Sequence, residues 1–307
     1  MELAVHWRKA PSAEEASRTL DSLSALLGRH PRSSEDEHGG PLRIHRFYMG
    51  DEFCARRAFS SFPPDDFLRL AEKEGAELAL LTPVLADPEL EGAVPLLERL
   101  ARERPRTEVV VNDWGVLSFL RENFPSFPLS AGRLLDKGFK DPRLPEALSL
   151  AELSSEALQL LETSAFDDDA FRQLLRRMGV RRLERDFLPY AGKPPEPHPH
   201  WEASVYFPYG VVTTGRACWT AAFGASPSPP FVPGAPCSRP CRSWSLRLSH
   251  PSFRFRIFQN GNTVFYEYSS DMLKDLVVPF DEKEAGDFAD AIRPPRLVYQ
   301  GAALRLP

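Results

Sequence analysis

The sequence predicts an α/β fold, a TIM-like (β/α)8 barrel with a small cysteine-bearing β insertion between the seventh and eighth strands. Strand-like and helix-like segments alternate over the first 210 residues, which implies parallel strands with right-handed crossovers. Seven strands can be counted up to Gly210, and an eighth near the end of the chain would close a barrel. No glycine-rich phosphate fingerprint supports the alternative, a doubly wound open sheet.

Each predicted element has a local signal. Apolar residues recur at helical spacing after Ser12, a suitable N-cap. Residues 107–113 contain a β-branched run, three successive valines, typical of a buried parallel strand. A helix over 63–76 opens with prolines and acids and ends near Gly75. The predicted strands are 3–7, 43–50, 77–83, 107–113, 127–135, 181–187, 203–210 and 296–301. The predicted helices are 12–29, 63–76, 89–104, 114–123, 154–164, 167–180 and 283–292.

The expected organisation has three parts. Residues 1–210 hold the first seven barrel strands, 211–280 form the cysteine-bearing insertion, and 281–307 supply the last helix and the closing strand. The insertion holds two strand-like runs, 243–249 and 253–269, and Asn-Gly-Asn at 260–262 within the second predicts a hairpin turn. A proline-rich segment, 191–201, stands where a regular barrel places its sixth helix.

Composition limits the function classes. A net charge of −5 argues against non-specific nucleic-acid binding, although a local basic patch could still hold a specific nucleic acid. There is no signal-peptide pattern and no apolar run that could span a bilayer, so we expect a cytoplasmic protein with no membrane span. Thiols stay reduced in that compartment, which favours a metal or a cluster over disulfides.

The four cysteines are the strongest chemical signal. Cys54 follows a predicted strand, and Cys218, Cys237 and Cys241 lie in the insertion. Because Cys54 and Cys218 each follow a predicted barrel strand, the topology predicts one shared site at the barrel mouth. Four thiolates suit an iron–sulfur cluster or a structural zinc, and spacing alone does not choose between them. The competing interpretation is that Cys54 is an ordinary buried thiol.

Polar groups at the predicted strand ends are candidates for substrate binding. Asp113 is also a good N-cap for the helix that follows it, and capping is its more common role. Arginines 56, 57, 216, 239 and 242 lie near cysteines in sequence, where they could bind an anion or simply form a solvated face. The substrate candidates are Asn112, Asp113, Arg133, Glu184, Tyr209 and Arg216, with Thr82 and Asp186 at the same strand ends.

The segments around the cysteines resemble a known family. FYMGDEFCARRAF, GRACWTAAF with CSRPC, TEVVVNDWGVLSFLRE and FQNGNTVFYEYSSD are similar to segments of the UbiU/UbiV group in the collagenase-like peptidase family U-thirty-two. The resemblance runs from about residue 44 to 300, and the one-plus-three cysteine pattern is its specific part. The chain departs from the group in a longer, proline-rich spacer between Cys218 and Cys237.

The resemblance implies a TIM-like barrel and a 4Fe-4S cluster held by Cys54, Cys218, Cys237 and Cys241. It implies oxygen-independent hydroxylation of a small organic or quinone-precursor substrate (or, in some members, of an RNA base), with a second member of the same family as a partner. The alternative is a non-enzymatic structural protein or partner subunit with a structural zinc or cluster. A peptidase is the third interpretation, and the chain offers no hydrolytic motif for it.

Overall fold

The computed structural model describes residues 2–26, 43–59, 64–141, 153–189, 198, 200–223, 237–251, 253–277, 296–301 and 304. Eight parallel strands close into a barrel in the order β1-β12-β7-β6-β5-β4-β3-β2, which confirms the predicted (β/α)8 fold. The strands are β1 Leu3–His6, β2 Arg46–Gly50, β3 Glu77–Thr82, β4 Glu108–Val111, β5 Leu129–Ala131, β6 Val180–Arg185, β7 Glu202–Phe207 and β12 Arg296–Tyr299.

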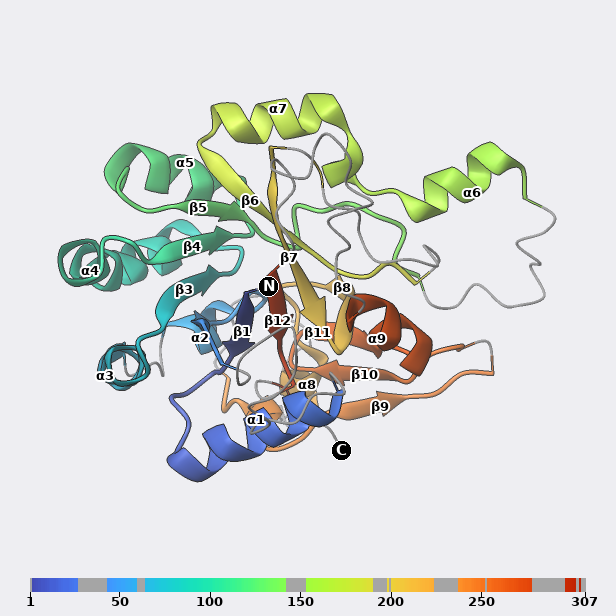
Figure 1. Ribbon diagram of the computed structural model, residues 1–307, viewed down its shortest axis with the longest axis horizontal. Coiled ribbons are helices and arrows are strands. Elements are labelled where there is room, and N and C mark those ends of the chain that lie inside the picture. The colour runs from blue at the N-terminus through green and yellow to red at the C-terminus, as the bar shows by residue number, and fades with distance from the viewer. Residues whose placement is uncertain are drawn as a thin grey trace, which may run out of the picture.

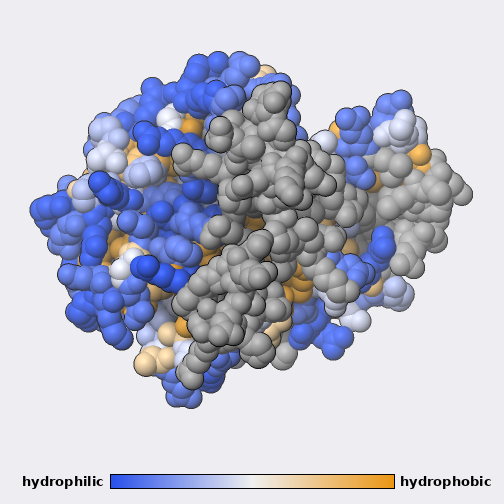
Figure 2. Space-filling model, viewed as in Figure 1, coloured by the Kyte–Doolittle hydropathy of each residue, from blue (hydrophilic) through white to orange (hydrophobic). Residues whose placement is uncertain are grey.

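Helices follow most of these strands and cover the outside of the barrel. They are α1 Ala13–Leu26, α2 Ala55–Ala58, α3 Pro64–Glu74, α4 Asp87–Glu103, α5 Trp114–Asn123, α6 Ser155–Glu162, the 3₁₀ turn η2 Ala165–Asp167 and α7 Asp169–Arg177. Helices α3, α4 and α5 lie at the left and α7 at the top in Figure 1, and hydrophilic side chains predominate along these two sides in Figure 2. Their apolar faces pack on the strands in one continuous core.

A second, antiparallel sheet lies on the other side of the barrel, next to β12 in Figure 1. Its order is β8-β11-β10-β9, and the turn at 260–262 joins β10 to β11 as predicted. We call this sheet with its short helices the cysteine module. Its elements are β8 Tyr209–Thr214, α8 Trp219–Ala222, η3 Pro240–Arg242, β9 Leu246–Leu248, β10 Ile257–Asn260, β11 Thr263–Glu267 and α9 Ser270–Val277.

The barrel interior is filled by side chains. Tyr48 and Tyr206 meet edge to face, with small residues such as Ala4 and Ala79 beside them. Large and small side chains of this kind together fill an eight-stranded barrel without leaving a channel. Any substrate site therefore lies at a barrel end or beside it.

Some expectations need correction. The seventh strand ends at Phe207, so Tyr209 is not at its carboxyl end but begins β8 of the second sheet. The short helices α2 and α8 were not predicted, since four residues carry no helical period. The expected helix over 283–292 lies outside the described residues. Among the residues described between β6 and β7 there is no helix, and no helix in the described part of the chain could cross a bilayer.

Candidate cysteine site

The four cysteines come from three segments that the fold brings to the cysteine module. Cys54 is the N-cap of α2, directly beyond the carboxyl end of β2, and Cys218 is the N-cap of α8. Cys241 is buried in η3, and Cys237 lies just before it. The expectation that Cys218 directly follows a barrel strand was wrong, because β8 intervenes. All four thiols are free.

The Asn-Gly-Asn turn connects these segments. The Asn262 side chain donates hydrogen bonds to the backbone oxygens of Phe53 (2.6 Å) and Gly215 (2.7 Å), one on each of two cysteine segments. Asn260 donates to the carbonyl of Cys241 at 3.2 Å, and Gly261 accepts the Thr220 hydroxyl at 2.9 Å. One turn therefore fixes the backbone around Cys54, Cys218 and Cys241.

A buried arginine lies among the thiols. Arg57 pairs with Asp51 through Nε (2.8 Å to Oδ2) and Nη2 (3.1 Å to Oδ1). Its Nη1 donates to Asn260 Oδ1 at 3.1 Å and lies 3.6 Å from Cys241 Sγ. Gly261 packs against this guanidinium so closely that an added Cβ would lie 2.5 Å from Nη1. The charge of Arg57 also reaches Cys54 and Cys218.

The positive charge in this cluster exceeds the negative charge that pairs with it. Arg8, largely buried, shares Asp51 with Arg57, its Nε lying 3.3 Å from Oδ2, and also donates to Asn260 Oδ1 at 2.8 Å. Asp51 accepts the backbone N–H groups of Phe53 and Cys54 as well, both at 2.9 Å. Two guanidinium groups thus share one carboxylate next to the thiols.

Burial and nearby donor groups act in opposite directions on the pKa of Cys54 and of Cys218. Burial raises the pKa of Cys54, and the Arg57 guanidinium counteracts the rise. Burial also raises the pKa of Cys218, where the Ala221 N–H, 3.4 Å from the sulfur, acts in the opposite direction. The Arg239 N–H lies 3.3 Å from Cys237 Sγ. Donors therefore point at three of the sulfurs, a feature that favours thiolates when a metal is bound.

The described residues do not contain a preassembled metal site. No three His, Cys, Asp or Glu side chains among them are arranged to hold an ion. The kinds of donor present are those that a thiolate-bound metal or cluster uses: free thiols, N–H groups that point at three of them, and two arginines beside them. The thiol sulfurs are not arranged around a common point in this structure, so binding a metal or cluster would require them to move closer together.

The barrel mouth itself is filled by a second arginine cluster. Arg133 pairs with Glu52 (2.5 Å) and Asp186 (2.7 Å), is fully buried, and has its guanidinium carbon 3.7 Å from the centre of the Tyr206 ring. Lys140 pairs with Asp186 at 3.0 Å. These four charges balance, and the sequence-based expectation that Arg133 faces a substrate is replaced by an internal ion-pair network.

Glu184 lies deeper in the barrel. It accepts hydrogen bonds from Tyr48 (3.1 Å) and Ser204 (3.0 Å). Burial and the nearby Glu108 carboxylate raise its pKa to about 7. Because it is fully buried, this position does not match the substrate-binding role that the sequence suggested.

The remaining candidates lie near the rim. Asn112 is buried and uses its amide on Thr82 O and Leu134 N, and Asp113 caps α5 by accepting the N–H groups of Gly115 and Val116. Tyr209 packs edge to face on Phe258. Thr82 bonds to Val110 O, and Asp186 belongs to the Arg133 network. Arg216 is half exposed and pairs with Glu89 at 3.1 Å.

A cavity of about 480 Å³ collects three of these candidates beside the cysteine segments. Asn112, Asp113 and Arg216 line it, together with apolar side chains and Lys137. Phe53 and Gly215, both fixed by Asn262, form the wall toward Cys54 and Cys218. Apolar side chains with a few polar groups among them are the kind of lining that small-molecule sites have.

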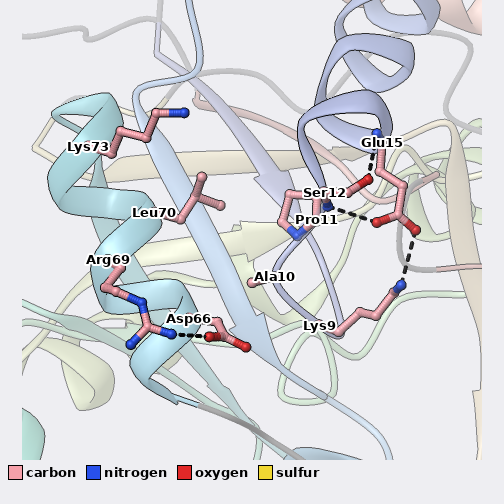
Figure 3. A pocket seen from close by; sticks show the side chains of 9 residues that line it. All are labelled: Lys9, Ala10, Pro11, Ser12, Glu15, Asp66, Arg69, Leu70 and Lys73. Atoms are coloured by element: carbon pink, nitrogen blue, oxygen red, sulfur yellow. Dashed lines mark hydrogen bonds and ion pairs between the residues drawn. The ribbon is translucent and has the colours of Figure 1, made fainter.

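A second cavity of similar volume lies outside the barrel between α1 and α3 (Figure 3). Four of its charged side chains form two ion pairs, Lys9 with Glu15 at 3.1 Å and Arg69 with Asp66. No residue nominated from the sequence lines it, and it lacks any link to the thiols.

Sequence reasoning missed the groups that organise the cysteine site. Arg8, Asp51, Asn260 and Asn262 were not nominated, and the Asn-Gly-Asn turn was interpreted as a hairpin turn alone. Two asparagines flanking the turn glycine were a usable signal, because Asn side chains can bond backbone groups on other segments.

The chain was also compared with known proteins. No protein-family model, no curated protein and no solved structure matches it.

Proposed function

We propose that this protein binds a 4Fe-4S cluster through Cys54, Cys218, Cys237 and Cys241 and serves the oxygen-independent hydroxylation of a small organic substrate. The resemblance in the cysteine segments suggests this activity. The observation that carries the cluster assignment is the pair of arginines, Arg8 and Arg57, sharing Asp51 beside the thiols.

Charge balance supports a thiolate-bound group at this position. A buried cation in excess is costly unless an anion compensates it. Neutral thiols do not supply that anion, whereas thiolates around a metal do. The N–H groups that point at Cys218 and Cys237 would stabilise the same thiolate state.

When bound, a 4Fe-4S cluster supplies one-electron redox chemistry. This chain's own residues would hold and surround it: four cysteines as ligands, Arg57 beside Cys241, and the Asn-Gly-Asn turn fixing the three segments. The cavity lined by Phe53, Asn112 and Arg216 is the proposed substrate site, because it shares a wall with two of those segments. The proposed setting is the cytoplasm, with a second member of the same family as a partner.

Anaerobic reconstitution with iron and sulfide tests the cluster. We expect about four irons and four sulfides per chain, with visible absorption from thiolate-to-iron charge transfer. Each Cys→Ser variant should lose most of this iron, whereas Ser238→Ala, an exposed position between Cys237 and Cys241, should retain it. Iron retention by all four variants would refute the assignment.

The enzymatic part has a separate test. Anaerobic incubation of the cluster-loaded protein with a cell's small-molecule extract and a two-electron acceptor should convert a C–H bond of one compound to C–OH. The oxygen would come from water, with two electrons and two protons passing to the acceptor, and the Cys54→Ser variant should not form this product. A cluster without any such product would remove the hydroxylase and leave a structural or partner role.

The second candidate is a structural zinc. It is favoured by the Asn-Gly-Asn turn, which already ties the cysteine module to the segment after β2, a connection that a zinc ion would reinforce. Metal analysis giving one zinc and no iron, with folding that depends on the metal, would select it over the cluster.

A further inference from the structure

The first part of the cysteine module, residues 209–256, carries a charge opposite to that of the rest of the chain. Residues 209–256 contain six arginines, no lysine and no acidic residue. Removing these six from the chain's 38 Lys and Arg, against 43 Asp and Glu, leaves a net charge of −11 elsewhere. The overall negative charge therefore hides a basic region, and its partner is expected to be anionic.

Three exposed aromatic side chains lie in this region. The exposed fractions are 56% for Trp219, 68% for Phe223 and 37% for Trp244. Trp219 and Phe223 are four residues apart at α8 and so lie on one side of it. Phe223 contacts Trp244 with ring centroids 6.4 Å apart, which joins the three into one surface.

Cationic side chains border the aromatic surface. Arg242 is two residues before Trp244, and Arg247 lies on β9, the edge strand of the sheet. Both are exposed, and neither pairs with an acid within the part of the chain that the structure describes. Arg216 and Arg256 have acidic partners, Glu89 and Glu267, from outside the acid-free stretch.

We propose that the surface formed by Trp219, Phe223, Arg242, Trp244 and Arg247 docks the protein onto an anionic lipid membrane. Aromatic rings favour the interfacial region of a bilayer, and each arginine near an anionic surface adds to the attraction. Single-stranded nucleic acid is less suited to this geometry, because base stacking needs open ring faces. Phe223 and Trp244 meet at 83°, so the edge of one ring occupies the face of the other.

Docking here would place the membrane next to the candidate site. Trp219 directly follows Cys218, and Arg242 directly follows Cys241. The inference does not rest on the cluster, because the surface is made of residues that take no part in holding it.

Vesicle sedimentation tests the proposal with the full chain as purified. We expect binding to phosphatidylcholine vesicles containing phosphatidylglycerol and little binding to pure phosphatidylcholine. The double variant R242E/R247E should weaken the partition coefficient by roughly thirtyfold or more, and added salt should weaken wild-type binding. Trp219→Ala with Trp244→Ala should also weaken it.

Matched controls separate this surface from general effects. R69E/R102E makes the same charge change on α3 and α4, and Leu160→Ser removes a more exposed apolar side chain on α6. Both should bind vesicles like the wild type, and all variants should show the wild-type circular dichroism spectrum. Vesicle binding that survives R242E/R247E, no binding to anionic vesicles, or binding of a single-stranded oligonucleotide in place of vesicles would each overturn the proposal.

Discussion

Two buried arginines receive neighbouring carboxylates from one short segment, yet their surroundings differ. Asp51 pairs with Arg57 on the side of the cysteine module, and Glu52 pairs with Arg133 at the barrel mouth. Around Arg133, two cations meet two carboxylates; around Arg57, two cations meet one carboxylate and a thiol sulfur. The balanced cluster is complete as it stands, which is typical of a structural plug. The unbalanced cluster has capacity for an anionic group.

The largest expected effect comes from breaking the balanced cluster. Arg133→Met leaves Glu52 without its buried partner, which should cost about 3–5 kcal/mol of unfolding free energy. Denaturant unfolding measures it. Adding Glu52→Gln should recover part of the loss, since it removes the orphaned charge. A single variant as stable as the wild type would mean that the mouth cluster is not structural.

Arg57→Met should destabilise the fold less than Arg133→Met does, but should reduce metal binding more. Asp51 keeps Arg8 and two backbone donors, so we expect a loss of about 1–3 kcal/mol. Metal retention should fall several-fold, because the cation beside Cys241 is gone. The measurement is the iron or zinc content per chain after gel filtration. Arg133→Met is measured in the same way, with its metal content expressed per folded molecule. If Arg57→Met and Arg133→Met lost the same stability and both retained full metal, the proposed difference between the two arginine clusters would be wrong.

Gly261→Ala tests the Arg57 cluster by changing the backbone turn that packs against the guanidinium. Gly261 has φ +68° and faces Arg57, so alanine adds a strained conformation and a contact that must shift the guanidinium. The left-handed conformation alone costs about 1–2 kcal/mol. Gly92→Ala is the matched control, because that glycine lies within α4 with open space around it, and the change should stabilise slightly. Thermal unfolding should occur at a lower temperature in Gly261→Ala than in Gly92→Ala, and the metal content of Gly261→Ala should also be lower.

Glu184→Gln tests the barrel interior through the pH dependence of stability. The folded-state pKa of Glu184, about 7, lies above its ordinary value of 4.5, so the folded chain holds this proton more tightly than the unfolded chain. Wild-type stability should therefore fall as pH rises from 4.5 through 7. Glutamine mimics the protonated acid and should remove this part of the slope. Parallel stability curves for the two proteins between pH 5 and 8 would contradict it.

The fold was largely predictable because its signals are local. The β-branched run of β4 and the Pro-Asp-Asp start of α3 depend on neighbouring residues only. The boundary after Phe207 was missed although Pro208, which lies between β7 and β8, is a strand-breaking signal. The four-residue helices α2 and α8 are too short to leave a periodic pattern.

The site was predictable only in part. The cysteines could be nominated from residue type, and the strand after which Cys54 lies was correct. The partners of Arg133 and Arg57 could not be predicted, because they depend on how distant segments meet in the fold. Glu52 lies 81 positions from Arg133 along the chain, and Cys241 lies 184 positions from Arg57. Glu184 was nominated from its place near a strand end, but its side chain points into the filled barrel.

The position of β12 determines when the molecule can be completed during synthesis. β12 is the strand that joins β1 to β7, and it follows all four cysteines and the Asn-Gly-Asn turn along the chain. Ribosomes add about 5–20 residues per second, so the growing chain carries its thiols for some seconds while β1 and β7 still have open edges. We expect that interval to be the time at which the thiols are most accessible to whatever loads them.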